Sequence, residues 1–152
     1  MIFIRDVTNS DNSVILDTEI KCYENPWTEV ELLACKSKNI YLRVACVGGI
    51  LRHSAQAGHA AFQIAGNTVK ILRLCVRLNW RRQRVGSALI DHINEFAKRI
   101  NKKRLQTVIR ESEDARQLVA CNFLKVQGFR ANGILHPEGT EEEFYIFQRR
   151  VK

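Results

Sequence analysis

The amino-acid sequence predicts a mixed α/β domain with about four helices and a mostly antiparallel central sheet of six to seven strands. Short runs that alternate apolar and polar residues recur along the chain, as is typical of strands. Longer segments place apolar residues three and four positions apart, as amphipathic helices do. The 152 residues, of which 45% are hydrophobic, include only two prolines and eight glycines. The chain can therefore bury one core and contains no linker-like segment, and we expect a single domain over residues 1–152.

The N-terminal part predicts a short strand followed by two helices. A helix over about residues 11 to 23 follows a polar capping segment, and Asn25-Pro26 ends it. Thr28 begins a second, short helix, because Glu31 three residues later completes a capping box. We expect the buried side of this second helix to consist of Val30, Leu33 and Ala34.

The rest of the chain predicts three more strands, a helix, a strand, a helix and two final strands. The first three form an antiparallel meander over residues 40–47, 55–64 and 69–78. A helix of about 16 residues begins at Val85 and crosses over to a parallel strand, 105–109. The last elements are a helix over 114–127 and strands over 129–135 and 143–150. We expect these residues of the last helix to face inward: Leu118, Cys121, Leu124 and Val126.

The net charge of +8 is concentrated in the middle of the chain. Residues 70–110 carry twelve Lys or Arg side chains and only two acids, Asp91 and Glu95, which is a local balance of +10. Such a concentration predicts an anionic ligand, whether a nucleotide-like cofactor, a nucleic acid or an acidic surface. The cations over residues 98–104 also have a simpler explanation, because positive side chains stabilise the C-terminal end of a helix.

The five cysteines form no C-x-x-C pair and are widely spaced, so the sequence predicts buried free thiols, no disulfide framework and no metal site. The N-terminal segment has too short an apolar run for a signal peptide, and no apolar run approaches 18 residues. We therefore expect a cytoplasmic protein in a reducing compartment, with no membrane partner.

The segment from Trp80 to Leu89 is the most informative part of the sequence. It follows an apolar strand, contains three arginines and a glycine, and leads into the amphipathic helix. A basic turn between a strand and a helix presents backbone N–H groups and the positive end of the helix dipole at one point. The segment therefore predicts a phosphate-binding site.

This turn and the order of elements resemble the GNAT superfamily of acetyl-coenzyme A dependent N-acetyltransferases over essentially the whole chain. In that family a turn of the form Arg/Gln-x-x-Gly-x-Gly/Ala holds the pyrophosphate of coenzyme A, and here Arg84 stands in place of the first glycine. The resemblance implies a sheet that is splayed around its central strand pair, where backbone groups hold the pantetheine and polarise the acetyl carbonyl. It implies these residues for cofactor binding: Leu74, Cys75, Val76, Arg81, Arg82, Gln83, Arg84, Val85, Gly86 and Ser87.

Four short segments are similar to the ribosomal-protein-alanine acetyltransferases, which modify the amino terminus of a protein. They are Asn25-Pro26-Trp27-Thr28-Glu29, Ile109-Arg110-Glu111-Ser112, Gln127-Gly128-Phe129-Arg130-Ala131 and Phe144-Tyr145-Ile146-Phe147. The resemblance implies a protein or peptide amine as acceptor, for which a ribosomal protein is one possibility. Trp27 is either an anchor in the core or a wall of the acceptor groove.

The usual acid and base of the family are missing from their positions. Val108 stands where the resemblance places a catalytic glutamate, and Leu124 stands where it places a tyrosine. The catalytic residues are therefore unknown. Glu111, Glu113 or Asp114 are candidates for a replacement base, although acids also stabilise a helix N-terminus without any catalysis. The family's asparagine corresponds to Glu113 or to Gln117.

Other titratable side chains are weaker candidates, because single histidines and tyrosines on strands usually pack or face solvent. They are Tyr41, Tyr145, His53, His59 and His136. Cys75 or Cys121 as an acetylated nucleophile is less favoured still, because no histidine partner is marked.

Three functions follow from the sequence. The first is transfer of an acetyl group from acetyl-coenzyme A to an amino group. The second is an acyl-coenzyme A binding or regulatory module that has lost catalysis. The third is ribosome or nucleic-acid binding through residues 70–110, which is disfavoured because Trp80 and Phe96 are the only aromatic residues in the basic part.

Overall fold

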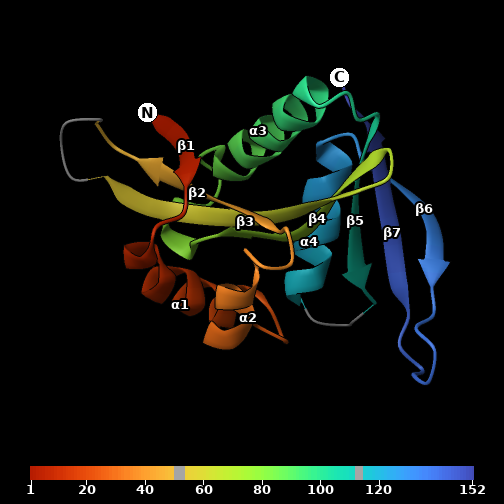
Figure 1. Cartoon of the computed structure of the whole chain (residues 1–152). Coiled ribbons are helices and arrows are strands. Elements are labelled where there is room, and N and C mark those ends of the chain that lie inside the picture. The colour runs from red at the N-terminus through yellow and green to blue at the C-terminus, as the bar shows by residue number, and fades with distance from the viewer. Residues whose placement is uncertain (50–53, 112–114) are drawn as a thin grey trace. The chain divides into compact units, whose positions relative to one another are not determined.

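The computed structural model describes residues 1–49, 54–111 and 115–152. These described residues form four α-helices and seven strands (Figure 1). The helices are α1 (Asn12–Cys22), α2 (Glu29–Ala34), α3 (Val85–Arg99) and α4 (Ala115–Val126), with 3-10 turns η1 (Asn9–Asp11) and η2 (Leu78–Trp80). The strands are β1 (Ile2–Asp6), β2 (Tyr41–Val47), β3 (Ala55–Ala65), β4 (Thr68–Val76), β5 (Arg104–Arg110), β6 (Arg130–Leu135) and β7 (Phe144–Arg150).

The seven strands are hydrogen-bonded in the order β1-β2-β3-β4-β5-β7-β6. The pairs β1–β2, β2–β3, β5–β7 and β6–β7 are antiparallel. The pair β4–β5 is parallel, with Thr68 opposite Arg104 and Ile71 opposite Thr107. The predicted mixed sheet and the parallel crossover through α3 are therefore confirmed.

The described residues fall into two compact units, each with its own core. The first comprises residues 1–63 and 73–93, and the second comprises residues 64–72 and 94–152. In the first unit, α1 and α2 lie on one face of β2 and β3 (Figure 1). Its core joins Ile15 of α1 and Leu32 of α2 to Val44 and Cys46 of β2, and Trp27 packs against this group. The α1–α2 connection is thus fixed by apolar burial.

In the second unit, hydrogen bonds to Asn94 of α3 hold the C-terminal end of the chain. Asn94 donates its side-chain amide to the Lys152 carbonyl at 3.1 Å and accepts from the Lys152 backbone N–H at 3.1 Å. Arg149 also donates to Asn94, at 2.9 Å, and its guanidinium lies 5.4 Å from the ring centre of the buried Phe129. These contacts order the last residues of the chain around one buried amide.

The predicted buried face of α2 is wrong, and that of α4 is only partly correct. Val30 and Leu33 of α2 are 77% and 59% exposed, whereas Leu32 and Cys35 are buried. Both pairs have the same spacing of three, so the sequence alone does not determine which pair faces the core. In α4, Leu118 and Val126 are likewise exposed and Leu124 is buried. Val126 is the last residue of that helix, where the chain turns away.

None of the described helices is both long enough and apolar enough to span a membrane. The cysteines are free thiols, of which Cys35, Cys46 and Cys75 are buried and Cys22 and Cys121 are partly buried.

Candidate functional site

The turn between β4 and α3 contains two arginines in the left-handed backbone region. Arg81 has an ordinary φ of −70°, but Arg82 and Arg84 have φ values of 60° and 66°. Successive backbone N–H groups of a turn can form a nest that binds an anion. Helix α3 begins directly afterwards, and its dipole adds positive potential there. The predicted phosphate site therefore has a physical basis in its backbone.

Arg84 has a left-handed backbone conformation. The family that this turn resembles has glycine at this position, and glycine adopts that conformation without strain. A non-glycine residue in the left-handed region carries a cost of about 1–2 kcal/mol, because its Cβ approaches the following carbonyl oxygen. The side chain of Arg84 is exposed, so burial does not offset that cost. The turn therefore holds Arg84 in a backbone conformation that glycine adopts without strain.

Strand β4 ends at Val76, two residues before the predicted end, because residues Leu78–Trp80 form a 3-10 turn. The Arg77 N–H donates to the Ala57 carbonyl of β3 at 2.8 Å. Backbone groups alternate sides along a strand, so Leu74 and Val76 direct theirs to the opposite edge of β4. Two of the predicted cofactor residues thus present their backbone at one edge.

The end of helix α1 reaches this edge of β4. The Leu74 N–H donates to the Tyr23 hydroxyl oxygen at 3.0 Å, and that hydroxyl lies 3.4 Å from the Leu74 carbonyl oxygen. The Val76 carbonyl accepts from Arg81 Nε at 3.2 Å and lies 3.8 Å from Cys22 Sγ. A hollow lies beside these contacts and is lined by residues of α1 and of the β4 end: Asp17, Thr18, Lys21, Cys22, Val76, Arg77, Leu78, Asn79 and Arg81.

Cys75, also predicted to bind the cofactor, directs its side chain into the core. Its Sγ lies 3.1 Å from Glu19 Oε2, and both residues are buried. Glu19 accepts three further hydrogen bonds, and the donors are Trp27 N at 3.1 Å, Arg73 Nε at 2.9 Å and His59 Nε2 at 3.2 Å. A single carboxylate thus connects α1, the α1–α2 connection, β3 and β4.

The surroundings of Glu19 determine its protonation. Burial alone would raise the pKa of the carboxyl group, but the hydrogen bond and charge of His59, the Cys75 thiol and the Arg73 guanidinium lower it below the usual value. Glu19, His59 and Cys75 offer three metal-ligand types whose donor atoms lie within 4.8 Å of one another. Because four donors already satisfy the carboxylate, hydrogen bonding explains this cluster and we assign no metal to it.

Arg73 links the buried carboxylate to two aromatic rings. Its guanidinium carbon lies 4.4 Å from the ring centre of Tyr23 and 4.9 Å from that of Trp27. Its Nη2 also donates to the Asn25 carbonyl at 3.1 Å. Cation–π contacts of this kind hold the rings in fixed positions. Trp27 therefore has the contacts of a core anchor, while its predicted role in acceptor binding stays a prediction.

Two thiols near the β4 end have opposite pKa shifts. A hydrogen bond with Cys75 and the charge of Arg81 lower the pKa of Cys22 to about 7, although burial opposes them. Burial raises the pKa of Cys75 well above its ordinary value, and the shared hydrogen bond with Cys22 adds to that increase. Cys75 therefore stays protonated and is a poor nucleophile.

In the second unit, the two positions where the resemblance places acid and base carry no titratable group. Val108 of β5 is 36% exposed, and Leu124 of α4 is 3% exposed. Glu111 accepts a hydrogen bond from the Tyr145 hydroxyl at 3.0 Å, and this bond raises the pKa of Tyr145. Glu113 and Asp114 lie outside the described residues, as does His53.

The remaining titratable candidates have structural contacts. The Tyr41 ring stacks on Phe62 with centres 5.5 Å apart. His59 contacts Glu19, as described above, and His136 lies 3.9 Å from Glu143. Burial raises the pKa of Cys121. Gln117 lies in α4.

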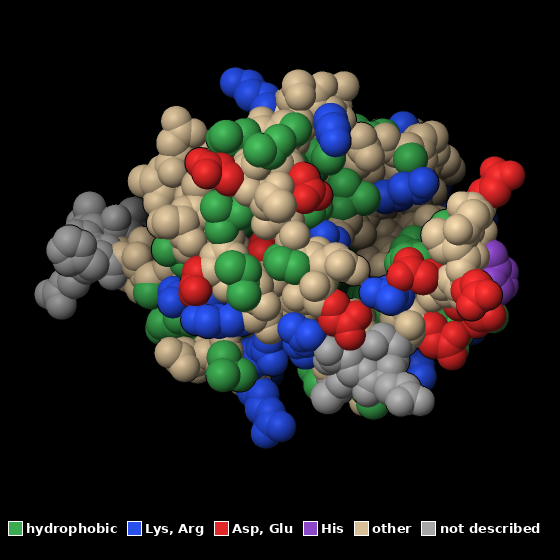
Figure 2. Space-filling view, turned by 90° about the horizontal axis from the view of Figure 1, so that it is seen from below, with side chains coloured by type: hydrophobic (Ala, Val, Ile, Leu, Met, Phe, Trp, Pro, Cys, Tyr) green, Lys and Arg blue, Asp and Glu red, His purple; other side chains and the backbone are tan. Residues whose placement is uncertain are grey.

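Part of the basic charge is engaged within the protein. Arg73 contacts Glu19, Arg77 donates to the Gln56 carbonyl at 3.0 Å, and Arg81 donates to the Val76 carbonyl. On the face in Figure 2, Lys and Arg side chains lie among Asp and Glu side chains and do not form one continuous basic surface. Three of the twelve cations of residues 70–110 are therefore held by contacts within the protein.

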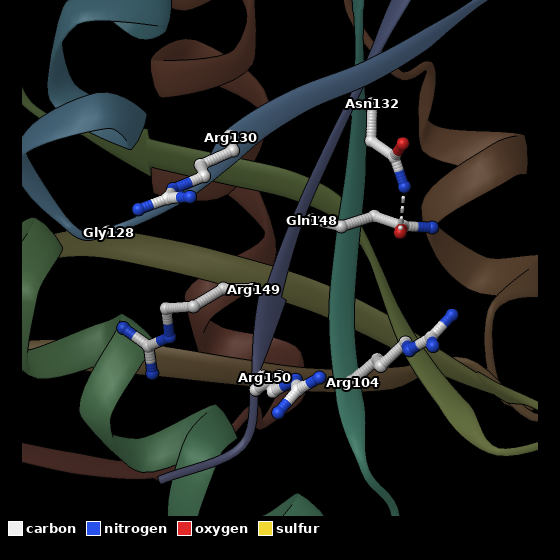
Figure 3. A pocket seen from close by; sticks show the side chains of 7 residues that line it. All are labelled: Arg104, Gly128, Arg130, Asn132, Gln148, Arg149 and Arg150. Atoms are coloured by element: carbon white, nitrogen blue, oxygen red, sulfur yellow. Dashed lines mark hydrogen bonds between the residues drawn. The ribbon is translucent and has the colours of Figure 1, made fainter.

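A second hollow lies in the second unit and is rich in arginine (Figure 3). Its lining residues are Arg104, Gly128, Arg130, Asn132, Gln148, Arg149 and Arg150. Asn132 donates to Gln148 Oε1 at 2.7 Å, as the dashed line in Figure 3 marks. Only Arg104 belongs to the basic segment found in the sequence. The other arginines come from strand ends that are far from it along the chain.

Sequence reasoning missed the contribution of α1 to this site. Glu19, Tyr23 and Trp27 are spaced by four, so Glu19 and Tyr23 lie on one face of the helix end. That spacing is a detectable signal. Their partners Arg73 and His59 come from other strands, and no local pattern connects them to α1.

These features define a class of protein with a basic strand-turn-helix segment on a mixed sheet. Residues 38–131, more than half of the chain, match the family model described as Acetyltransferase (GNAT) domain. The chain therefore belongs to the GNAT family of N-acetyltransferases. No protein of curated function matches the sequence.

Solved structures share the fold over nearly their whole length. One is the ribosomal-protein-S18-alanine N-acetyltransferase from Escherichia coli, with 18% identity, a TM-score of 0.78, and 99% of this chain and 94% of that chain covered. Ard1 from Thermoplasma volcanium has 21% identity, a TM-score of 0.80, and coverage of 99% and 98%. Arabidopsis thaliana NAA60 in complex with acetyl-CoA has 17% identity, a TM-score of 0.79, and coverage of 99% and 99%. At these identities the likeness describes the fold.

The strain at Arg84 can be measured directly. We expect Arg84→Gly to be more stable than Arg84→Ala by about 1 kcal/mol, because both remove the charge but only glycine accepts the left-handed conformation without strain. Urea unfolding of the two variants measures the difference. Equal stabilities would mean that the turn carries no such strain.

The Glu19 network is expected to dominate the stability of the first unit. Glu19→Gln replaces one acceptor oxygen by an NH2 group that faces donors, so we expect a loss of about 3–5 kcal/mol. The exposed Glu138→Gln is the matched control and should change stability by less than about 0.5 kcal/mol. Chemical denaturation at pH 7 provides the comparison.

The same pair of proteins tests the protonation of Glu19. Because its pKa is lowered in the folded state, its contribution is complete above the unfolded value of 4.5 and is lost as the pH falls through the folded value. The stability difference between wild type and Glu19→Gln should therefore shrink as the pH falls from 6 toward about 3. A difference that stays constant would contradict the lowered pKa.

Proposed function

We propose that the chain transfers the acetyl group of acetyl-coenzyme A to an amino group of a protein or peptide, with the N-terminal α-amine as the preferred acceptor. The observation that supports this most strongly is the left-handed backbone at Arg82 and Arg84 at the start of α3. That backbone fits a pyrophosphate, because convergent N–H groups and a helix dipole both favour negative charge. Acetyl-coenzyme A would supply an activated acetyl thioester.

The residues proposed to hold the cofactor act in two ways. In the turn, the backbone from Arg81 to Ser87 supplies donors, and Arg82 and Arg84 add positive charge that suits phosphate. On β4, the backbone groups of Leu74 and Val76 face the edge away from β3 and are suited to pair with amide groups of pantetheine. Cys75 contributes to cofactor binding only by its position between Leu74 and Val76 in the strand, because its side chain contacts Glu19.

The missing base supports an α-amine as acceptor. The attacking amine must be neutral, and without a side-chain base its own pKa controls the neutral fraction. An α-amine has a pKa of 7.7–8.0, so roughly a third is neutral at pH 7.5, whereas a lysine amine with a pKa of about 10.4 is neutral in only about one molecule in a thousand. The Escherichia coli neighbour is named for acetylation of a ribosomal-protein alanine, and a ribosomal protein is accordingly one acceptor to test.

A second candidate function is an acyl-coenzyme A binding or regulatory module without turnover. The side chains of Val108 and Leu124 favour it, because neither can transfer a proton. Both functions share the cofactor, and both fit a cytoplasmic protein, where the free thiols would stay reduced. Detection of an acetylated product separates the two.

Cofactor binding should stabilise the protein against heat. At a concentration of acetyl-coenzyme A about 100 times its Kd, we expect about 2.7 kcal/mol of added stability and a Tm increase of several degrees. Arg82→Glu should weaken binding by tenfold or more, because it places a negative charge beside the phosphates. Arg99→Glu has the same change of charge at the other end of α3 and should bind like wild type. Thermal shift and calorimetry measure both effects.

Acceptor choice can be measured with paired peptides. One carries a free α-amine and acetylated lysines, and the other carries an acetylated N-terminus and free lysines. We expect the first to react at least about 100-fold faster at pH 7.5, on the basis of the neutral fractions alone. Mass spectrometry locates the added acetyl group. Equal rates would show that the protein has a base for lysine, and binding without any product would support the module.

A further inference from the structure

We propose that the hydroxyl group of Tyr23 is the proton donor for the thiol that leaves acetyl-coenzyme A. This assignment rests on the proposed acetyl transfer. It gives the chain an acid from the residue directly after helix α1, whereas the position of the family's tyrosine is occupied by Leu124 on α4.

The position of the Tyr23 hydroxyl supports this role. It accepts a hydrogen bond from the Leu74 N–H at 3.0 Å and lies 3.4 Å from the Leu74 carbonyl oxygen. Leu74 is one of the backbone positions proposed to hold the acyl end of the cofactor. The Leu74 N–H group is directed at the Tyr23 oxygen. A cofactor atom that accepts a hydrogen bond from this N–H group must therefore lie at the position of that oxygen or beside it. The phenol is therefore within contact distance of the acyl donor.

Tyr23 is also held in place. Its ring lies 4.4 Å from the guanidinium carbon of Arg73, which Glu19 and the Asn25 carbonyl fix at 2.9 and 3.1 Å. A proton donor needs a defined orientation, and a ring between a strand edge and an anchored guanidinium has one. Glu19 and Arg73 are positioning residues in this arrangement.

The surroundings keep Tyr23 protonated. Burial raises the pKa of its hydroxyl group well above 10, and the neighbouring Cys75 and Glu19 add to the increase. Cys22, the preceding residue, differs because its pKa of about 7 leaves a large thiolate fraction at neutral pH. Of Cys22 and Tyr23, only Tyr23 stays protonated at all ordinary pH values and can therefore donate a proton.

The proton transfers balance over the reaction. The amine nitrogen attacks the thioester carbon and forms the C–N bond, and the C–S bond breaks with its electron pair on sulfur. Tyr23 gives its proton to that sulfur, and the phenolate takes back the surplus proton of the nitrogen, which restores the residue.

Tyr23→Phe tests the assignment, because it removes only the hydroxyl and keeps the ring beside Arg73. With the best free-amine peptide of the acceptor screen, we expect kcat to fall at least about 100-fold. The Kd for acetyl-coenzyme A should stay equal or become tighter, since the hydroxyl no longer occupies Leu74. Tyr41→Phe is the matched control, because its ring stacks on Phe62 of β3, and it should keep kcat within about twofold of wild type.

A second measurement does not depend on activity. The chain has only three tyrosines, so 3-fluorotyrosine labelling gives three fluorine resonances. Tyr41→Phe and Tyr145→Phe assign the Tyr23 resonance by elimination, even if Tyr23→Phe fails to fold. Adding coenzyme A, the free-thiol product, should shift the Tyr23 resonance and leave that of Tyr41 in place.

The outcomes separate this proposal from the function on which it rests. If Tyr23→Phe keeps kcat within about threefold, or if coenzyme A leaves the Tyr23 resonance unmoved, the assignment is overturned and the acetyltransferase proposal stands. If the wild-type protein binds no acetyl-coenzyme A or acetylates no peptide, the proposed function fails and the assignment fails with it.

Discussion

The first unit depends on one buried carboxylate. Glu19 is fully buried and accepts hydrogen bonds from the α1–α2 connection, from β3 and from β4. An unpaired carboxylate in the protein interior costs several kcal/mol, so the unit is stable only when all these segments are in place. The same bonds fix the end of α1 against β4. Tyr23, one helical turn after Glu19, is thereby brought to the edge of the strand that is proposed to hold the acetyl donor.

The turn proposed to bind pyrophosphate illustrates how a motif can depend on backbone conformation more than on side chains. Pyrophosphate binding through backbone N–H groups requires a particular backbone conformation, whatever the side chain. Arg84 retains a φ of 66° at the position where the family has glycine. The chain therefore tolerates local strain and gains a positive charge at the same point. Strain of this size is common at functional sites, where the surrounding structure holds a residue in place.

Local patterns in the sequence predicted the mixed sheet, the crossover through α3 and the position of the turn. These features depend on periodicity and on short capping or turn motifs, which a single segment carries by itself. The buried face of α2 could not be predicted, because Val30 with Leu33 and Leu32 with Cys35 have the same spacing. The network around Glu19 could not be predicted either. His59 and Arg73 lie 40 and 54 positions from Glu19, and only tertiary structure brings them to it.

Cofactor binding and proton transfer place different demands on the sequence. The proposed binding uses mainly backbone groups, so a substitution such as Arg84 is compatible with it as long as the conformation is kept. Proton transfer requires a particular side chain, but that side chain can come from any element that reaches the reacting atoms. Val108 and Leu124 therefore show only that the positions of the family's base and acid carry no titratable side chain in this chain. The Tyr23 hydroxyl contacts the Leu74 backbone, and we propose that it supplies the proton from a residue that precedes Leu74 in the chain. The buried Glu19 carboxylate holds the end of α1 and strand β4, which carry these two residues, in place.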